Sequence, residues 1–171
     1  NWFDRVFDFN FPAEYFPYVL ERERGTPARL EELVHDIDPT MLAVRPEGED
    51  WSIQEHVGHL YDLEELHLGR LDDFSVNKDA LRAADLTNSK TYEADHNSSS
   101  LQSLLEKFRA VRKQFVARIE NLDETQIKQS ALHPRLGVPM RMVDLVLFTA
   151  EHDDHHLASI TIIRRQLAQG S

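Results

Sequence analysis

The stretch from residue 140 to residue 167, MRMVDLVLFTAEHDDHHLASITIIRRQL, decides the fold class. Its apolar side chains recur every three or four residues, which is the spacing of one face of an α-helix. The spacing predicts a helix that begins near Met140 and continues to about Ala168. On its inward face two imidazoles stand where a helical bundle normally has Leu or Ile. The line of this face runs through Leu145, Phe148, His152, His156, Ser159 and Ile163.

A second helix is predicted from the sequence WSIQEHVGHL at residues 51–60. Ser52 is an N-cap candidate, and Glu55 three residues later completes a capping box. The helix should run to about Val76. Its apolar face consists of Ile53, Val57, Leu60, Leu63, Leu71 and Phe74.

Two further helices complete the predicted fold. The first helix of the chain should span residues 13–37, because the pair Asp38-Pro39 ends it. The third should run from residues 98–100 to about Asn121, where leucines and phenylalanines form a stripe at helical spacing. No long alternation of apolar and polar residues is present, so we expect no sheet.

Two connectors join these helices. Residues 77–97 form a long crossover, part of which we expect to be a short helix, and residues 123–139 form a second connector. The expected fold is therefore all-α, a four-helix bundle with a long crossover between helices 2 and 3. At this length we expect one domain over residues 1–171.

Composition excludes several classes of protein. The chain has 19 basic and 30 acidic residues, a formal charge of −11, and no basic stripe interleaved with aromatic residues, so we expect no nucleic-acid partner. No apolar run approaches the roughly 20 residues of a membrane span, and the aromatic N-terminus does not resemble a signal peptide, so we expect no membrane association. The absence of cysteine excludes disulfides and thiolate metal sites and fits a cytoplasmic location.

Nine histidines are many for a chain of this length, and their placement predicts a metal site. His152 and His156 lie four residues apart on one helix face, the spacing by which helical zinc proteases present two ligands. Buried imidazoles need partners for both ring nitrogens, and a metal ion would satisfy one nitrogen on each ring. A third ligand should come from the second helix, which offers His56, His59 and His67. Helix geometry alone leaves these three open.

Acidic residues near these histidines are candidates for catalysis. On the second helix, Glu55, His56 and Asp62 lie within about 60° of His59 around the helix axis. Any of them could act as a general base, although Glu55 also has the capping role.

On the last helix, Glu151, Asp153 and Asp154 are expected to face solvent or the rim of the site. From there Asp153 or Glu151 could orient an imidazole by accepting a hydrogen bond from it.

Several segments of the chain resemble one known family. WSIQEHVGHLYDLEE (residues 51–65) resembles the second helix of the DinB-like (DinB/YfiT) family, where a W-S-x-x-E…H-L…E pattern carries the first metal-binding histidine. AEHDDHHLASI (residues 150–160) resembles the H-x-x-H-H pattern on that family's last helix. LTNSKTYEADHNSS (residues 86–99) and LHPRLGVPMRMVDL (residues 132–145) resemble its crossover and the entry to its fourth helix. The resemblance covers nearly the whole chain.

The resemblance selects His59, the histidine immediately before Leu60, together with His152 and His156. It implies that these three hold one divalent ion, usually nickel or zinc, at one end of the bundle, with water in the open positions. Many members have Glu where this chain has Asp153, so the carboxylate at this position is shorter here. Some members are described as metal-dependent hydrolases, and others are transferases or isomerases that use a low-molecular-weight thiol.

Three nitrogen ligands leave positions on an ion for water or substrate, which is typical of a catalytic site. We therefore expect a divalent-metal-dependent enzyme that acts on a small molecule, either a hydrolase or a low-molecular-weight-thiol transferase. The alternatives are a non-catalytic metal-binding or stress-response module, and a helical partner-binding domain in which the histidines are core residues. The aromatic N-terminal stretch is expected to pack on the bundle or on a second subunit of a homodimer.

Overall fold

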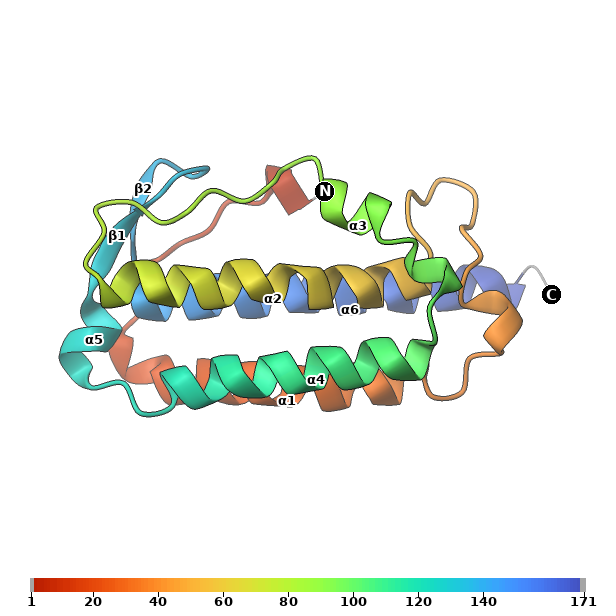
Figure 1. Cartoon of the computed structure of the whole chain (residues 1–171), viewed down its shortest axis with the longest axis horizontal. Coiled ribbons are helices and arrows are strands. Elements are labelled where there is room, and N and C mark those ends of the chain that lie inside the picture. Colours follow the sequence, from red (N-terminus) through yellow and green to blue (C-terminus); the bar gives the residue numbers. More distant parts are fainter. Residues whose placement is uncertain (1, 170–171) are drawn as a thin grey trace.

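Four long helices form the body of the molecule (Figure 1), in a computed structural model that describes residues 2–169. Their apolar faces turn inward, so the predicted all-α four-helix bundle is confirmed. The four helices are α1 (Phe16–Val34), α2 (Ile53–Ser75), α4 (Leu101–Ile119) and α6 (Met142–Gln169).

The start of α2 has the predicted capping box. The Ser52 hydroxyl accepts a hydrogen bond from the Glu55 N–H at 3.2 Å, and the Ser52 N–H donates to the Glu55 carboxylate at 2.8 Å. By contrast, α1 is shorter than the predicted helix of residues 13–37. The residues before it form a 3-10 turn, η2 (Ala13–Tyr15), and the chain after it turns into η3 (Pro39–Met41).

The helices pack as a square in which α1 and α2 each contact both α4 and α6. Figure 1 shows α1 and α6 running in one direction along the bundle and α2 and α4 running in the other. Because α2 and α4 are parallel neighbours, the chain between them must return along the length of the bundle. A helix of 23 residues is about 35 Å long, so the long crossover is a geometric requirement of this topology.

The crossover contains α3 (Ser89–Glu93) and the 3-10 turn η4 (His96–Ser98), which confirms the short helix predicted there. Asn88 and Asp95 precede these two elements and adopt left-handed backbone conformations, with φ of 54° and 47°. Both elements pack on α2. The crossover therefore brings its side chains to the helix that carries His59.

The connector before α6 contains a hairpin that corrects the expectation of no sheet. After the short helix α5 (Glu124–Lys128), strands β1 (Ser130–His133) and β2 (Val138–Arg141) pair in antiparallel register. Buried and exposed residues alternate along β1. Four-residue strands are too short for such alternation to be distinguished from a loop by sequence.

The buried core consists of two apolar clusters with a polar layer between them. One cluster contains the first two turns of α6, and the other contains Leu157, Ile160 and Ile163 further along that helix. Buried polar side chains occupy the interval: Glu23, Glu64, Arg112, His152, Asp153 and His156. The polar groups therefore lie near the middle of α6, and not at one end of the bundle as the resemblance implies.

The aromatic N-terminal stretch packs on the molecule's own bundle. The rings of Trp2 and Phe7 lie 5.2 and 4.9 Å from the ring of Phe148 on α6, and Phe9 and Phe11 pack against the same apolar cluster. No helix within residues 2–169 combines the length and apolar character that a membrane crossing requires.

Candidate metal centre

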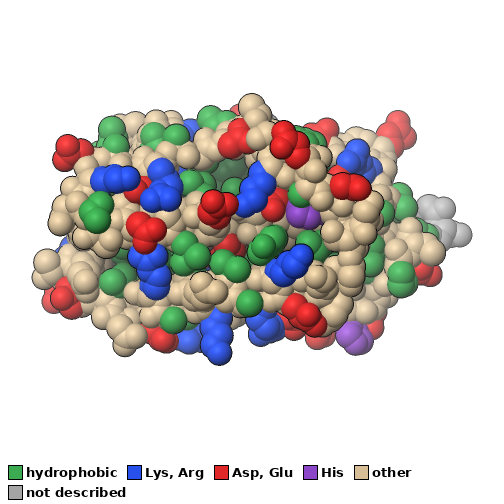
Figure 2. Space-filling view, viewed as in Figure 1, with side chains coloured by type: hydrophobic (Ala, Val, Ile, Leu, Met, Phe, Trp, Pro, Cys, Tyr) green, Lys and Arg blue, Asp and Glu red, His purple; other side chains and the backbone are tan. Residues whose placement is uncertain are grey.

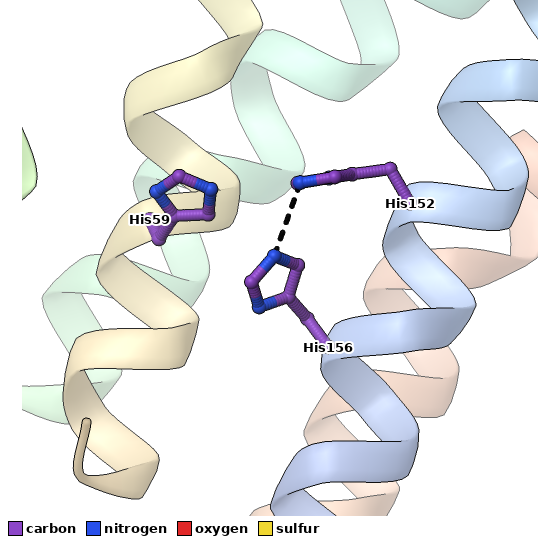
Figure 3. Close-up of side chains that lie close together, drawn as sticks. All are labelled: His59, His152 and His156. Atoms are coloured by element: carbon purple, nitrogen blue, oxygen red, sulfur yellow. Dashed lines mark hydrogen bonds between the residues drawn. The ribbon is translucent and has the colours of Figure 1, made fainter. Parts of the chain in front are cut away.

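Two imidazoles project from successive turns of α6 toward α2 (Figure 3). His152 and His156 are both buried, and their Nε2 atoms lie 3.1 Å apart. Two nitrogens bound to a tetrahedral zinc ion at about 2.0–2.1 Å are separated by about 3.3 Å. The spacing of the two Nε2 atoms therefore suits a shared ion.

His59 of α2 completes the group. One nitrogen from each of the three imidazoles lies within 4.8 Å of the others, and the rings of His59 and His156 are 4.7 Å apart. The other two histidines of α2 have different partners. His67 Nδ1 lies 3.3 Å from Glu64 Oε1, and His56 contacts Nδ1 of His156, the ring nitrogen that does not face His152. Of the three candidates on α2, His59 is the one whose nitrogen groups with the α6 pair.

A hydrogen-bond chain from the crossover holds the Nδ1 atom of His59. His59 Nδ1 lies 2.9 Å from the Thr91 hydroxyl, which lies 3.0 Å from Asp62 Oδ2. A carboxylate only accepts hydrogen bonds, so the Thr91 hydroxyl donates its proton to Asp62 and accepts the proton of His59 Nδ1–H. The lone pair of neutral His59 is therefore on Nε2, where a metal can take it. Partners of this kind fix the tautomer and orientation of a metal-binding histidine.

Asp62 is held in turn by His96 of η4, whose Nε2 donates to Asp62 Oδ2 at 2.7 Å. The His96 ring lies so close to α2 that a Cβ on Gly58 would be 2.2 Å from its Cγ. Only glycine leaves room for this ring, which explains a residue of low helix propensity inside α2. Asp62, a candidate for the general base, thus lies behind His59 as part of its support.

His156 has a supporting partner on α2. Its Nδ1 lies 2.8 Å from Nδ1 of His56, so one of these nitrogens donates to the other. When His156 offers the lone pair of Nε2, its proton is on Nδ1 and His56 accepts the hydrogen bond. Trp51, just before α2, stacks on His156 with centroids 5.8 Å apart and lies 4.6 Å from the His59 ring.

Sequence reasoning did not identify Thr91, His96 or Trp51 as part of this site, and it considered His56 only as a ligand or base. Residues of the crossover follow no helical period that would aim them at α2. The one sequence signal was Gly58, whose place inside a helix marks a close approach by another segment.

Burial keeps the clustered imidazoles neutral. It is the main cause that lowers the pKa of His59 to about 3 and the pKa of His56 to about 4. Burial, followed by the neighbouring imidazoles, also holds the pKa of His152 and His156 well below the ordinary value. At neutral pH these rings are neutral, which is the state that metal binding requires.

Glu55, another candidate for the base, is engaged at the helix start. Its carboxylate accepts from the Ser52 N–H and from Arg45 Nε, each at 2.8 Å, and forms a further contact with Arg45 Nη2. Burial would raise the pKa of Glu55, but these hydrogen bonds lower it to about 2. A carboxylate with so low a pKa and such partners is a poor proton acceptor.

Asp153 does not face solvent or the rim, contrary to expectation. It is fully buried and accepts hydrogen bonds from Arg112 of α4, one of them 3.1 Å long. Arg112 also donates to Glu23 of α1 and to Glu64 of α2, each at 2.6 Å, so all four helices meet at one guanidinium. The correction has a geometric reason. Because α6 packs against both α1 and α2, a position about 100° around from His152 still points into the interior.

The carboxylates around Arg112 differ in their ionisation. Burial raises the pKa of Glu23 well above its ordinary value. Burial acts in the same direction on Glu64, but Arg112 and His67 outweigh it and lower the pKa of Glu64 to about 2. Burial therefore opposes the charge of Glu23, whereas Arg112 and His67 favour the carboxylate form of Glu64.

Glu151 and Asp154 lie at the half-buried rim, as expected. Glu151 pairs with Arg5 at 2.5 Å and Arg22 at 2.8 Å, and Asp154 pairs with Arg22 at 2.5 Å and Arg29 at 2.6 Å. Within residues 2–169 the hydrogen bonds of Glu151 and of Asp153 come from arginines, and neither of these carboxylates is bonded to an imidazole. The expectation that Glu151 or Asp153 orients a site histidine is therefore wrong, and Thr91 and His56 take that place.

A partly open cavity of 330 Å³ gives access to the three histidines. Trp51 bounds it from the α2 side, and Trp2 bounds it from the N-terminal side, where its ring lies 4.9 Å from that of His152. Glu49 and Asp50 place carboxylates in its lining. Over the part of the chain that the structure describes, the clustered ligand atoms belong to these three histidines. The cavity is of a size that holds a small molecule.

These residues fit a divalent metal ion. Three neutral imidazoles converge, and partners hold the remaining nitrogen of two of them. Imidazole nitrogen suits zinc, nickel, copper and iron alike. A three-nitrogen set without a thiolate or a fourth protein ligand resembles open sites more than structural ones.

Comparison with known proteins is consistent with this arrangement. The sequence profile of the DinB superfamily matches residues 24–160. Among curated protein sequences no match is found.

Two solved structures share the fold. YfiT from Bacillus subtilis, a probable metal-dependent hydrolase with an unusual four-helix bundle topology, is similar with a TM-score of 0.77 and 20% sequence identity, over 96% of this chain and 94% of that one. A mycothiol-dependent maleylpyruvate isomerase is similar with a TM-score of 0.68 and 9% identity, over 88% of this chain and 61% of that one. At these identities the likeness shows the fold alone.

Proposed function

This chain belongs to the DinB superfamily, and on that premise we propose that it is a divalent-metal-dependent enzyme acting on a small molecule at His59, His152 and His156. The observation that carries the proposal is the convergence of three neutral imidazoles, from two helices, on a cavity open to solvent. Three ligands leave positions for water or substrate. The similarity to a probable metal-dependent hydrolase supports the proposal.

Two reaction classes fit this site, hydrolysis and thiol transfer. A divalent ion held by the three histidines would lower the pKa of a bound water or thiol and so supply a nucleophile near neutral pH. Hydrolysis also calls for a base that reaches the attacking water. The carboxylates of the three candidate bases Glu55, Asp62 and Asp153 are all engaged away from the cavity, which leaves Glu49 and Asp50 as the carboxylates in its lining.

We favour a low-molecular-weight-thiol transferase over a hydrolase, because attack by a thiolate does not depend on a protein base that reaches a bound water. A thiol would lose its proton to solvent, and its sulfur would form a bond to an electrophilic carbon while the leaving group departs with the electron pair of the broken bond. No carboxylate base of the protein is required at that step. The similarity to a mycothiol-dependent isomerase also supports thiol chemistry.

The chain's own residues position the reactants. The hydrogen bond between Thr91 and His59 keeps one lone pair directed to the site, and His56 does the same for His156. The indole rings of Trp2 and Trp51 form apolar walls against which a substrate packs and which limit the entry of water. Zinc and nickel are the ions we propose.

Metal analysis of untagged protein tests the site. We expect about one equivalent of divalent metal in the wild type and a loss of that metal in His156→Ala. The control is His35→Ala, because His35 is exposed at the end of α1 and should not affect metal content. If His156→Ala retains the metal, the site assignment is wrong.

A turnover panel tests the reaction. Bacillithiol, mycothiol and glutathione are each offered with an electrophilic substrate, and ester and amide substrates are assayed in parallel. We expect metal-dependent consumption of a thiol. Metal-dependent cleavage of an ester or amide would favour the hydrolase. A protein that binds metal without turnover across the panel would instead be a non-catalytic metal-binding module.

A further inference from the structure

A second cavity of 70 Å³ adjoins the metal centre. It is lined by residues of α2, the crossover, the β1–β2 hairpin and α6. It shares five lining residues with the solvent-open cavity: Trp2, Phe3, His59, Asn88 and His152. Figure 2 shows that this face of the molecule is hollowed between α2 and the crossover, with charged side chains around the hollow. The two cavities therefore meet at two of the proposed metal ligands.

Buried N–H donors in the lining of this cavity lack acceptors. Arg70 is 3% exposed, and within residues 2–169 its one hydrogen bond runs from Nε to the Arg82 carbonyl at 3.2 Å. Arg135 Nη2 is buried and has no hydrogen-bond partner. His133 is 1% exposed, and its Nδ1 accepts from the Leu136 N–H at 3.3 Å. The proton of His133 is therefore on Nε2, which is also buried without a partner.

The two guanidiniums lie close together in an apolar setting. Burial lowers the pKa of Arg70 to about 10, and the positive charge of Arg135 acts in the same direction. Burial and these two arginines lower the pKa of His133 to about 4. The Arg135 guanidinium lies 5.6 Å over the Phe148 ring. Arg70 is buried, and Arg135 is half-buried with a buried Nη2 atom. A buried cation normally requires a carboxylate partner, and a chain of charge −11 does not lack carboxylates.

Two carboxylates near these donors are engaged with other groups. Asp85 lines the cavity, but its two oxygens accept from the backbone N–H and hydroxyl groups of Thr87 and Ser89. Asp73, which attracts Arg70, is bonded through both oxygens to Arg82, and through one of them also to Lys78.

We propose that this inner cavity binds a carboxylate group of the substrate, with Arg70, Arg135 and His133 Nε2 as its hydrogen-bond donors. A carboxylate offers the acceptor oxygens that these buried donors lack, and guanidiniums match its planar geometry. One water molecule needs about 10–15 Å³, so the cavity has room for a carboxylate and a short carbon chain. As a substrate subsite it rests on the proposed function, because the opposite end of the anchored molecule would reach His59 and His152. The substrate class is then a small carboxylic acid whose reacting group lies a few atoms from the carboxylate.

Calorimetric titration of the full-length, metal-loaded protein with succinate tests this subsite. Succinamide has nearly the same shape without the charge, and we expect it to bind at least tenfold more weakly. Arg135→Gln should weaken succinate binding at least tenfold, because it removes a charge-assisted donor. Arg165→Gln is the matched control, since Arg165 is exposed near the end of α6. Arg70→Gln should weaken succinate binding in the same way. If Arg70→Gln fails to fold because Arg70 is buried, Arg135→Gln in the hairpin still tests the proposal.

Three results would overturn the proposal. They are absence of succinate binding to the wild type at millimolar concentration, an affinity unchanged in Arg135→Gln, and tighter binding of inorganic phosphate than of succinate. Repeating the titration after a chelator has removed the metal separates this proposal from the proposed function. Binding that persists without metal supports the subsite even if no turnover is found. If succinate binds only when the metal is present and binds Arg135→Gln as tightly as the wild type, its carboxylate is bound to the ion. That result would refute the subsite.

Discussion

Replacing Thr91 with Val should weaken metal binding although Thr91 is not a ligand. Valine has a similar size, and Thr91 is buried, so the main change is loss of the hydroxyl. In the metal-bound form His59 Nε2 is unprotonated, and the proton on Nδ1 then has no acceptor. In the metal-free form the proton can move to Nε2, which lies beside the cavity. The cost of an unsatisfied buried donor therefore falls on the metal-bound form.

That cost sets the size of the effect. A buried donor left without a partner costs about 1–3 kcal/mol, which corresponds to about a 5- to 150-fold change in a dissociation constant. Loss of a residue that supports a metal ligand typically weakens metal binding about 10–100-fold. We expect the zinc Kd of Thr91→Val to be about 10–100-fold higher than that of the wild type. Asp62 keeps its 2.7 Å hydrogen bond from His96, so the crossover should stay folded.

Competition with a chromophoric chelator measures the Kd of untagged protein. Thr91→Ser retains the hydroxyl and should bind zinc as the wild type does. Thr26→Val is the control for loss of a buried threonine hydroxyl, since Thr26 is fully buried on α1 and donates to the Arg22 carbonyl at 3.0 Å. It should lower stability and leave the Kd within about twofold of the wild type. A folded Thr91→Val protein whose Kd is also within twofold of the wild type would refute the tautomer argument.

The remaining predictions concern the polar layer and the ion. Arg112→Met should lower the free energy of unfolding by about 3–5 kcal/mol, because it leaves buried carboxylates unpaired. Denaturant titration measures this free energy. The control is Arg109→Met, which should lower it by less than about 1 kcal/mol because Arg109 is exposed. Glu23→Gln should change stability at pH 7 by less than about 1 kcal/mol, because burial already favours the neutral acid; a loss as large as that of Arg112→Met would contradict this assignment. The pKa of Glu64 is lowered from 4.5 to about 2. Its contribution of about 3 kcal/mol to the free energy of unfolding is therefore present above pH 4.5 and is lost as the pH falls towards 2. Unfolding followed by circular dichroism should show a loss of stability in acid that is smaller in Glu64→Gln. Zinc at about 100 times its Kd should stabilise the wild type by about 2.7 kcal/mol against thermal unfolding, and a chelator should remove the effect; a His156→Ala protein that responds equally would place the ion elsewhere.

Much of the fold could be read from local patterns. The period of α6 and the capping box at Ser52 are properties of neighbouring residues, so sequence is enough to place them. The pairing of His152 with His156 also follows from the helix repeat, which is independent of the rest of the fold. The two short strands escaped detection because four residues hold too little pattern.

The support of the site could not be read in the same way. Thr91 reaches His59 because two left-handed residues bend the crossover onto α2, and nothing in their sequence fixes that path. Asp153 was expected outside because charge normally indicates exposure, yet its partner comes from another helix. Arg112 gave a hint, since it lies on the apolar stripe of α4 between Phe108 and Phe115. A cation on such a stripe predicts buried carboxylates opposite it.

The crossover also has a thermodynamic consequence for the ion. It contributes Thr91 and His96 to the support of His59 but none of the three clustered ligands, and it connects two of the four long helices rather than forming part of one. Local opening of the crossover would break the hydrogen bond between Thr91 and His59 while the four long helices remain folded. By linkage, an ion that prefers the closed crossover must stabilise it by the same free energy. Metal occupancy should therefore slow amide hydrogen exchange in residues 76–100 more than in the helices, which makes this connector the part of the chain that reports whether the site is filled.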